Sequence, residues 1–411
     1  MSIVDDTDAG LPARPRPRLN LLRELSDQAV LEAIFRSGPI TRPEIADQTG
    51  LSKPTVSEAV RRLTQGGFVR AAGSRPGRRG RTPVSYAVND TAGYVIGVDI
   101  GAANLRVGAA DIYGELLAEE HRATARDGAR ALAGQVHELV RDVMDRAGAT
   151  HGELLALGVS TPGVVDPVSR RVTSLAYNLS PDGAFDPLAA LRGRFDVPLL
   201  VDNNINLSAV GEKWRGVAAG VSDFVFVSVG AGVGMGIVVG DELVRGAHGA
   251  AGEIAYLPFT GDPYDDRHRV HGGFEDEVGA AGVLAAARAR DDWRGPPPES
   301  VAEVFERAAT DPAAQAIVEE EGRRIAFALA AICAVLDPAL VVLGGGIGSN
   351  PALLRPVRET VAALVPLTAR IETSSLRERS ALYGALAIAL REAREHLFRQ
   401  GRGAASGSPQ A

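Results

Sequence analysis

A pattern of buried strand, glycine turn and returning strand occurs twice in this chain. The first copy runs from Tyr94 through the turn at Gly101 to a returning strand at 104–111. The second copy starts at Val225 and turns through four glycines between Gly230 and Gly236. Each copy continues through a further glycine-containing turn into another strand. An internal duplication of this kind predicts two similar lobes that face one another across a cleft, and we expect the functional site in that cleft.

The length and composition predict a folded protein with more than one unit. A chain of 411 residues exceeds one ordinary core, since domains usually hold roughly 100–200 residues. Hydrophobic residues make up 45% and charged residues 23%, which excludes a largely disordered chain. The single cysteine, Cys333, excludes an internal disulfide framework and a zinc site built from cysteines. Cys333 lies in an apolar helical run, so we expect it in the core.

No segment has the pattern of a membrane span or an export signal. The uncharged run 224–240 is shorter than the roughly 20 residues that a span needs, and it carries five glycines. The first eleven residues contain three aspartates and no apolar stretch, unlike a signal peptide. We therefore expect a cytoplasmic protein that does not contact a membrane.

The net charge of −7 is unevenly distributed along the chain. Residues 11–89 hold fourteen lysines and arginines against six acidic residues, a balance of +8, so the remaining residues carry −15. Contacts from Lys and Arg to phosphate dominate nucleic-acid affinity. The asymmetry therefore predicts a polyanion partner for the N-terminal part only.

The N-terminal part has the pattern of a helix-turn-helix. A basic arm over 1–18 precedes a helix over 21–36, whose apolar residues recur at helical spacing. Thr41 and Glu44 form a capping box at the start of a second helix, which ends at Gly50. Ser52 caps a third helix that leaves a polar and basic set outside. In such a motif the first residues of the last helix enter the major groove of DNA.

Two short strands follow, at 68–70 and 84–88, and an arginine-rich connection joins them. Two strands with a basic tip predict a wing that contacts phosphate or a narrow minor groove. The alternative is a small helical module whose charges are only solvated. We expect DNA contacts from Arg42, Ser52, Lys53, Thr55, Ser57, Arg61, Arg62, Arg78, Arg79 and Arg81.

From residue 93 onward the chain resembles the ROK family of sugar kinases and repressors, which has the actin-like, sugar kinase and heat-shock ATPase fold. The resemblance covers roughly Leu19 to Leu397 and rests on several motifs in the right order. A winged helix ahead of this body is typical of the repressor branch. The matching segments are the first phosphate loop at 99–104, sugar-side loops at 158–166 and 177–179, the catalytic-aspartate segment at 201–206, the second phosphate loop at 230–236, the glutamate motif at 246–253 and a nucleotide-side turn at 343–346.

The resemblance implies an α/β fold class, with an N-terminal winged helix-turn-helix followed by a two-lobed actin-like or sugar kinase (ribonuclease H-like) body. We expect the winged helix over 19–90. The first, small lobe is expected over 91–203 with 385–398, and the second, large lobe over 204–384. The tail 399–411 is expected to be disordered.

Departures from the family pattern bear on catalysis. Phosphorylation of a sugar needs a carboxylate that accepts the hydroxyl proton, but Asn204 stands where the family has its aspartate. Ala102 and Ala103 replace the second glycine and the threonine of the first phosphate loop. We therefore expect no enzyme activity and no cofactor. A sugar kinase that also binds DNA is the alternative.

Many family members hold a structural zinc with one histidine and three cysteines. Here Tyr256 replaces the histidine, while Asp266, His268 and Gly273 fall near the cysteine positions. We expect no metal, although Asp266, His268 and His271 remain an alternative ligand set. Tyr256 could instead stack on a sugar or fill the space of the zinc.

Sugar binding can persist without catalysis, because hydroxyl groups need only convergent amides and carboxylates. The matching positions imply sugar contacts from Asn178, Asn203, Asn204, Glu253, Tyr256 and Glu275. They imply degenerate phosphate loops at Asp99, Gly101, Asn104, Gly230, Gly232 and Gly234.

These observations together predict a sugar-responsive DNA-binding transcriptional regulator, a repressor of carbohydrate-related genes. Its partners are expected to be a double-stranded DNA operator and a sugar or sugar phosphate. We expect a homodimer or homotetramer that associates with the nucleoid when bound to DNA. A regulator that senses a non-sugar ligand or a partner protein remains open.

Overall fold

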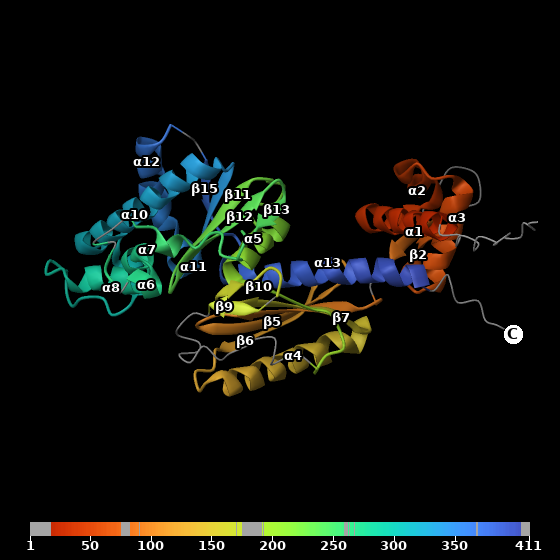
Figure 1. Ribbon diagram of the computed structural model, residues 1–411, viewed down its shortest axis with the longest axis horizontal. Helices are drawn as coiled ribbons and strands as arrows, with labels where there is room; N and C mark the ends of the chain where they lie inside the picture. Colours follow the sequence, from red (N-terminus) through yellow and green to blue (C-terminus); the bar gives the residue numbers. More distant parts are fainter. Residues whose placement is uncertain are drawn as a thin grey trace, which may run out of the picture. The chain divides into compact units, whose positions relative to one another are not determined.

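The computed structural model describes residues 18–74, 83–89, 91–169, 171–174, 191, 193–258, 262, 264–266, 268–366 and 369–403 (Figure 1). The chain divides into two compact units. One unit takes the residues up to Ala92 together with those from Arg394 onward, and the other takes Gly93–Ala393. The expected fold class, a winged helix-turn-helix followed by a two-lobed α/β body, is confirmed. The expected boundaries between the lobes stay a prediction.

The first unit is a winged helix whose turns follow from local signals. Glu44 Oε2 accepts a hydrogen bond of 2.8 Å from the backbone N–H of Thr41 at the start of the second helix. Gly50 ends that helix at φ +69°, a conformation that favours glycine. Ser52 Oγ caps the third helix through the N–H of Thr55. The elements are α1 (Arg18–Ser37), β1 (Ile40–Thr41), α2 (Arg42–Thr49), α3 (Lys53–Gln65), β2 (Val69–Ser74) and β3 (Val84–Val88), and the sheet order is β1-β3-β2.

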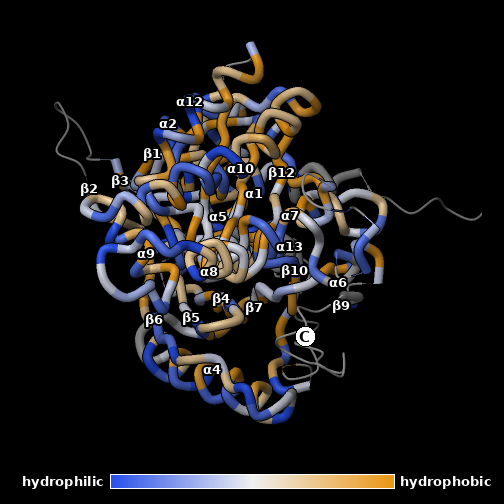
Figure 2. The backbone as a smooth tube through the Cα atoms, turned by 90° about the vertical axis from the view of Figure 1, so that its left-hand side faces the viewer, coloured by the Kyte–Doolittle hydropathy of each residue, from blue (hydrophilic) through white to orange (hydrophobic). Residues whose placement is uncertain are grey.

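The first sheet of the body is built on the first copy of the duplication. Helix α4 packs on one face of this sheet, and Figure 2 shows hydrophilic and hydrophobic stretches alternating along α4, as expected for a helix with one buried side. Helix α13 packs on the other face, where Gly97 and Gly158 lie against Leu386 and Ala385. The elements are β4 (Tyr94–Ile100), β5 (Asn104–Asp111), β6 (Leu116–Ala123), α4 (Ala129–His151), β7 (Leu154–Thr161), β8 (Val164–Val165), β9 (Val172–Ser174), β10 (Leu199–Asn203) and α13 (Ser380–Gly403), with the order β10-β7-β4-β5-β6 and β8 paired to β9.

The second sheet repeats the pairing of the first. In each sheet a central strand has one parallel neighbour, β7 beside β4 and β14 beside β11, and an antiparallel meander on its other side. The predicted duplication is therefore confirmed. The elements are α5 (Asn204–Arg215), β11 (Phe224–Val229), β12 (Val233–Val239), β13 (Glu242–Val244), β14 (Leu340–Gly344) and β15 (Arg370–Thr373), with the order β13-β12-β11-β14-β15.

One helix and a helical layer pack against the second sheet. Helix α5 contacts β11 and β12, and the largest apolar cluster of the described residues fills the space toward the other helices. Cys333 is buried in that cluster, as expected. The remaining elements are η1 (Ile254–Tyr256), α6 (His268–His271), α7 (Gly273–Val278), α8 (Ala280–Arg288), α9 (Val301–Arg307), α10 (Pro312–Leu336), α11 (Gly345–Gly348), η2 (Pro351–Leu353), α12 (Leu354–Leu364) and η3 (Arg377–Arg379).

Helices α5 and α13 cross at glycines. A Cβ added at Gly384 would lie 1.8 Å from the carbonyl oxygen of Leu207, and one added at Gly211 would lie 2.1 Å from that of Ser380. Helix α13 runs to Gly403, so the expectation of a disordered tail from residue 399 is wrong for 399–403. Extending a formed helix costs far less than starting one. No helix in the described part of the chain is both long enough and apolar enough to cross a membrane.

Candidate functional site

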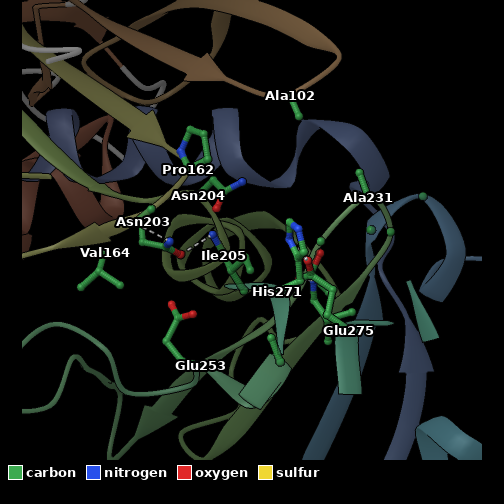
Figure 3. A pocket seen from close by; sticks show the side chains of 18 of the residues that line it. Ala102, Pro162, Val164, Asn203, Asn204, Ile205, Ala231, Glu253, His271 and Glu275 are labelled. Atoms are coloured by element: carbon green, nitrogen blue, oxygen red, sulfur yellow. Dashed lines mark hydrogen bonds and ion pairs between the residues drawn. The ribbon is translucent and has the colours of Figure 1, made fainter. Parts of the chain in front are cut away.

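A cavity of about 550 Å³ lies within the second unit, where the turns and loops of the two sheets meet (Figure 3). The first sheet contributes Ala102 from the turn after β4 and the Pro162–Val164 loop after β7. The junction between β10 and α5 contributes 203–205. The side of the second sheet contributes four segments: the glycine loop after β11, the glutamate motif around η1, part of α6 and α7, and the turn after β14. The lining residues from these segments are Ser228, Gly230, Ala231, Gly232, Val233, Glu253, Ala255, Tyr256, His271, Glu275, Gly345 and Gly346.

Five of the six expected sugar contacts line this one cavity. They come from three separate stretches of the chain, so the fold brings together residues that are up to about 70 positions apart in the sequence. The sixth, Asn178, lies outside the described residues. The five are Asn203, Asn204, Glu253, Tyr256 and Glu275.

Asn203 joins the two sides of the β10–α5 junction. Its Oδ1 accepts hydrogen bonds from the backbone N–H groups of Ile205, at 2.8 Å, and Asn206, at 3.2 Å, so it caps α5. Its Nδ2 donates a hydrogen bond of 2.8 Å to the carbonyl of Gly163. The amide therefore positions the loop after β7, and one N–H of Nδ2 is left for a ligand.

Asp202 was not expected to have a role, but its carboxylate stabilises the β10–α5 junction through hydrogen bonds from the backbone N–H of Asn203 and from Asn206 Nδ2. The residue is 3% exposed, and its side chain accepts hydrogen bonds from Arg245 Nε, at 2.8 Å, and from the N–H of Asn203, at 2.8 Å. Arg245 Nη2 lies 2.7 Å from the same carboxylate. Asp202 lies in the segment 201–206 that resembles the family's catalytic-aspartate segment, but no spacing in the sequence indicates Arg245 as its partner.

Asn204 is the first residue of α5 and lines the cavity. Within the described part of the chain its side chain has no hydrogen-bond partner, so both amide groups are available to a ligand. An amide can bind a hydroxyl group but cannot accept its proton. The position therefore suits binding of a sugar better than phosphate transfer to it.

Two carboxyl groups face the same cavity. Burial, and then the charge of Glu275, raises the pKa of Glu253. Burial also raises the pKa of Glu275, although the N–H of Val233, which donates to its Oε2 at 2.9 Å, acts in the opposite direction. His271 Nδ1 lies 3.9 Å from the other oxygen of Glu275. Glu275 thus fixes the glycine loop after β11 through Val233, and the carboxyl group of Glu253 lines the cavity.

The two expected phosphate loops differ in their position. Gly230 and Gly232 of the second loop line the cavity, whereas Gly234 packs on α5, where an added Cβ would lie 2.5 Å from Ile205 Cδ1. In the first loop Ala102 lines the cavity, and Gly101 closes the hairpin through a 3.0 Å hydrogen bond to the carbonyl of Asn104. Asp99, Gly101 and Asn104 are not among the cavity lining.

Asp99 is buried beneath the first loop. Ser160 Oγ donates a hydrogen bond of 2.7 Å to its Oδ1. Burial raises the pKa of Asp99 to about 6, although the Ser160 hydrogen bond and Arg106 favour the charged form. The residue is therefore held inside the sheet and does not line the cavity.

The residues near the expected zinc position have other partners. His268 Nδ1 lies 2.9 Å from Asp276 Oδ2, and Tyr256 is 53% exposed beside the cavity. Among the described residues no three His, Cys, Asp or Glu side chains are grouped so that they could hold a metal ion. The alternative ligand set Asp266, His268 and His271 therefore gains no support from the structure.

The expected DNA contacts of the first unit fall into two groups. Ser52, Lys53, Thr55 and Ser57 lie at or near the start of α3, and Lys53 is exposed. The three described arginines have partners inside the unit. Arg42 lies 5.0 Å from the ring centre of Tyr86, Arg61 pairs with Glu58, and Arg62 is 16% exposed and binds Asp27 on α1 at 2.5 and 2.9 Å.

Arg62 therefore stabilises the packing of α3 against α1, a role that its charge and its place on the helix did not predict. Arg78, Arg79 and Arg81 lie outside the described residues. The strands expected on either side of them form an antiparallel pair, with Val69 opposite Val88 and Ser74 opposite Val84. The wing is thus confirmed as a hairpin, and the roles of its arginines stay predictions.

The fold and the cavity define a two-lobed protein of the sugar-kinase type that carries a winged helix. The chain belongs to the ROK family, whose sequence pattern matches residues 95–392. A second pattern, described as winged helix-turn-helix DNA-binding, matches residues 23–70. The family expected from the motifs is therefore confirmed.

Curated relatives with similar sequences carry regulator names. The putative xylose repressor of Caldicellulosiruptor sp. (strain Rt8B.4) is 33% identical over 239 residues, which cover 58% of this chain and 59% of that protein. This chain therefore spans about three fifths of the length of that relative. The DNA-binding transcriptional dual regulator NagC of Escherichia coli (strain K12) is 26% identical over 386 residues, 91% of this chain and 94% of that protein.

Solved structures with the same fold include both regulators and kinases. A ROK family transcriptional regulator, described as a homolog of the E. coli MLC protein, has a TM-score of 0.75 at 18% identity, covering 93% of this chain and 99% of that one. The ROK hexokinase of Thermus thermophilus has a TM-score of 0.62 at 25% identity, covering 74% and 99%. The fold alone therefore does not separate a regulator from an enzyme.

Proposed function

We propose that this protein is a sugar-responsive transcriptional regulator, a repressor, whose winged helix binds a double-stranded DNA operator. A sugar or sugar phosphate binds in the cavity of the body and is not phosphorylated there. One observation carries the proposal: a winged helix-turn-helix precedes a ROK body in which the catalytic position is Asn204. The names of the xylose repressor and of NagC support it.

The chemistry of the cavity supports binding without transfer. A general base typically contributes 10²–10⁴-fold to the rate, and an amide at position 204 cannot supply it. Asp202 is close in sequence but is buried, pairs with Arg245 and does not line the cavity. Glu253 and Glu275 line the cavity and can accept hydrogen bonds from hydroxyl groups.

We further propose that the protein acts as a homodimer or homotetramer in the cytoplasm, associated with the nucleoid when bound to DNA. Symmetric dimers of helix-turn-helix proteins bind two half-sites about one or more helical turns apart. An operator with two-fold symmetry is therefore expected.

Selection of duplexes from a random pool by the full chain tests the DNA-binding half of the proposal. The replacement of Lys53, Thr55 and Ser57 by alanine should relax the base preference, because these side chains lie near the start of α3. Arg36→Ala, at the exposed end of α1, is the matched control and should preserve the preference. If the intact protein enriches no sequence at low salt, the regulator proposal is wrong.

An ATP-dependent phosphorylation assay separates the proposal from its main alternative, a sugar kinase that also binds DNA. We expect no turnover of pentoses, hexoses or amino sugars. Turnover on the order of 1 per second or faster would establish the kinase instead.

A thermal-shift screen of the same sugars identifies the effector, since a ligand of the folded state raises stability by mass action. The absence of any sugar shift would favour a non-sugar ligand.

A further inference from the structure

A second cavity, of about 200 Å³, lies between α8 and α10 in the helical layer of the body. It shares no lining residue with the cavity between the sheets. Its lining is Val283, Ala286, Arg290, Ala316, Ile317, Glu320, Glu321 and Arg324.

Glu321 of α10 is the unusual member of this lining. The residue is only 3% exposed, and its Oε1 has no hydrogen-bond partner in the described part of the chain. A buried polar group without a partner is unfavourable, and a carboxyl group is especially so. Burial raises the pKa of Glu321 well above the usual range. The charge of Arg324 acts in the opposite direction, and the carboxylates of Glu277 and Glu320 raise this pKa further.

The positive charges around Glu321 already have other partners. Arg324 lies 2.9 Å from Glu277 Oε2 on α7 and 3.2 Å from Glu320 Oε1. Arg290 lies 2.6 Å from Asp292 Oδ2. Arg323 lies 2.6 Å from Glu320 Oε2. Three guanidinium groups thus face four carboxyl groups, Glu321 included, so one negative charge is left over when Glu321 is ionised. This balance favours a cation and disfavours an anion.

The walls of the cavity are apolar, which restricts the kind of cation. Val283 and Ile317 are buried on either side, and Ala286 and Ala316 add small apolar surfaces. The described residues offer no group of three metal-ligating side chains, so an inorganic ion would lack ligands here. A pocket with apolar walls and one polar anchor is typical of a small organic ligand.

We propose that this cavity binds a small alkylammonium compound, whose N–H groups donate to the carboxyl group of Glu321 and whose alkyl chain packs on Val283 and Ile317. The protein would then have an amine site in the large helical layer, separate from the sugar cavity. An ammonium group beside Glu321 favours the ionised form of its carboxyl group. A charged donor that pairs with a buried carboxylate gives a strong hydrogen bond. Ligand binding would also satisfy Glu321 Oε1.

Thermal denaturation of the full chain with n-butylammonium chloride tests this site. Sodium butyrate, 1-butanol and sodium chloride are the matched controls for charge sign, apolar chain and salt. A ligand of about five non-hydrogen atoms binds in the millimolar range, so concentrations reach about 100 mM. We expect only butylammonium to raise Tm in a saturable way, by about 2 °C at ten times its Kd.

Three variants locate the site by calorimetric titration, each compared with its own ligand-free baseline. Glu321→Gln removes the charge, and Ala286→Leu fills the cavity from α8 while Glu321 stays intact. Both should weaken butylammonium at least about tenfold. Glu319→Gln, on the same helix but outside the lining, should bind as the wild type does.

Three results would overturn the proposal. The first is the absence of a butylammonium shift in the wild type, and the second is an equal or larger shift with butyrate. The third is unchanged affinity in Ala286→Leu, a variant that decides the question even if Glu321→Gln does not fold.

Discussion

The side-chain amide of Asn203 donates a hydrogen bond of 2.8 Å to the carbonyl of Gly163, across 40 positions of the sequence. The same side chain caps α5 through the N–H groups of Ile205 and Asn206. One residue therefore holds the loop after β7 against the start of α5, and both segments line the cavity. A residue expected as a sugar contact is thus also part of the wall that shapes the site.

Asn203→Ala should destabilise the body, because it removes a helix cap and a loop hydrogen bond together. Loss of such a cap costs about 1 kcal/mol, and the unpaired carbonyl adds a similar amount. Urea unfolding followed by circular dichroism measures the change. Asn204→Ala is the matched control, since the side chain of Asn204 makes no hydrogen bond within the described residues. Equal unfolding midpoints for the two variants would contradict the structural role of Asn203.

The parts of the fold that could be predicted from the sequence rest on local signals. The capping box at Thr41, the turn at Gly50 and the two strand–glycine–strand copies each lie within a few residues, so their periodicity and turn chemistry can be read directly. The duplication then implied two similar lobes with a cleft between them. The order of the motifs indicated which residues would line the cavity, and five of the six expected sugar contacts do line it.

The parts that could not be predicted depend on pairs that the fold brings together from far apart. Asp202 and Arg245 are 43 positions apart, and nothing in their spacing indicates an ion pair. Arg62 was expected to contact DNA because its charge and its position on the helix can be read from the sequence. Its ion pair with Asp27 on the facing helix cannot be read there. The hydrogen bond between Ser160 and Asp99 also depends on a distant pairing, because strands β4 and β7 bring these two residues side by side.

The pH dependence of stability should carry a contribution from Asp99. Burial raises the pKa of its carboxyl group from near 3.8 to about 6, so the folded protein holds this proton more tightly than the unfolded chain does. The contribution is therefore fully present below about pH 4 and is lost as the pH rises through about 6. A shift of this size corresponds to about 3 kcal/mol.

Asp99→Asn keeps an oxygen for the hydroxyl of Ser160 and removes the charge. Its free energy of unfolding, relative to that of the wild type, should increase between about pH 4 and pH 6 and change little above that range. Urea titrations at several pH values measure the difference. Asp127→Asn, at an exposed site, controls for the removal of a carboxylate. A difference between Asp99→Asn and wild type that does not vary with pH would be inconsistent with a buried, proton-binding Asp99.

The crossing of α5 and α13 should not tolerate a methyl group. In Gly384→Ala the new Cβ would lie 1.8 Å from the carbonyl oxygen of Leu207, so the helices must separate. Overpacking of this kind typically costs about 1–3 kcal/mol, more than the gain in helix propensity. Gly134→Ala on α4 is the matched control, because no atom lies within 4 Å of its added Cβ, and it should be neutral or slightly stabilising. A Tm for Gly384→Ala at or above that of Gly134→Ala would show that the two helices do not pack this closely.

Ligand binding in the cavity should change the affinity of the protein for DNA. Glu253 lines the cavity from the second sheet side, opposite the loop and junction held by Asn203. A sugar that contacts both sides of the cavity binds better when the two lobes are at one particular degree of closure. Only such a difference in affinity between closure states can change DNA binding. A coupling free energy of about 1–3 kcal/mol would change the affinity for the operator about 5- to 150-fold.

Glu253→Gln should weaken the effector and leave effector-free DNA binding intact, because the substitution keeps the shape of the side chain and lies in the body, outside the winged helix. Titration of labelled operator with both proteins, with and without the effector, measures the two affinities separately. Glu242→Gln, an exposed position on β13 outside the cavity lining, should respond to the effector as the wild type does. An equal effector response in Glu253→Gln would mean that this carboxyl group does not bind the sugar. Loss of DNA binding by the free variant would instead mean that the substitution had damaged the fold.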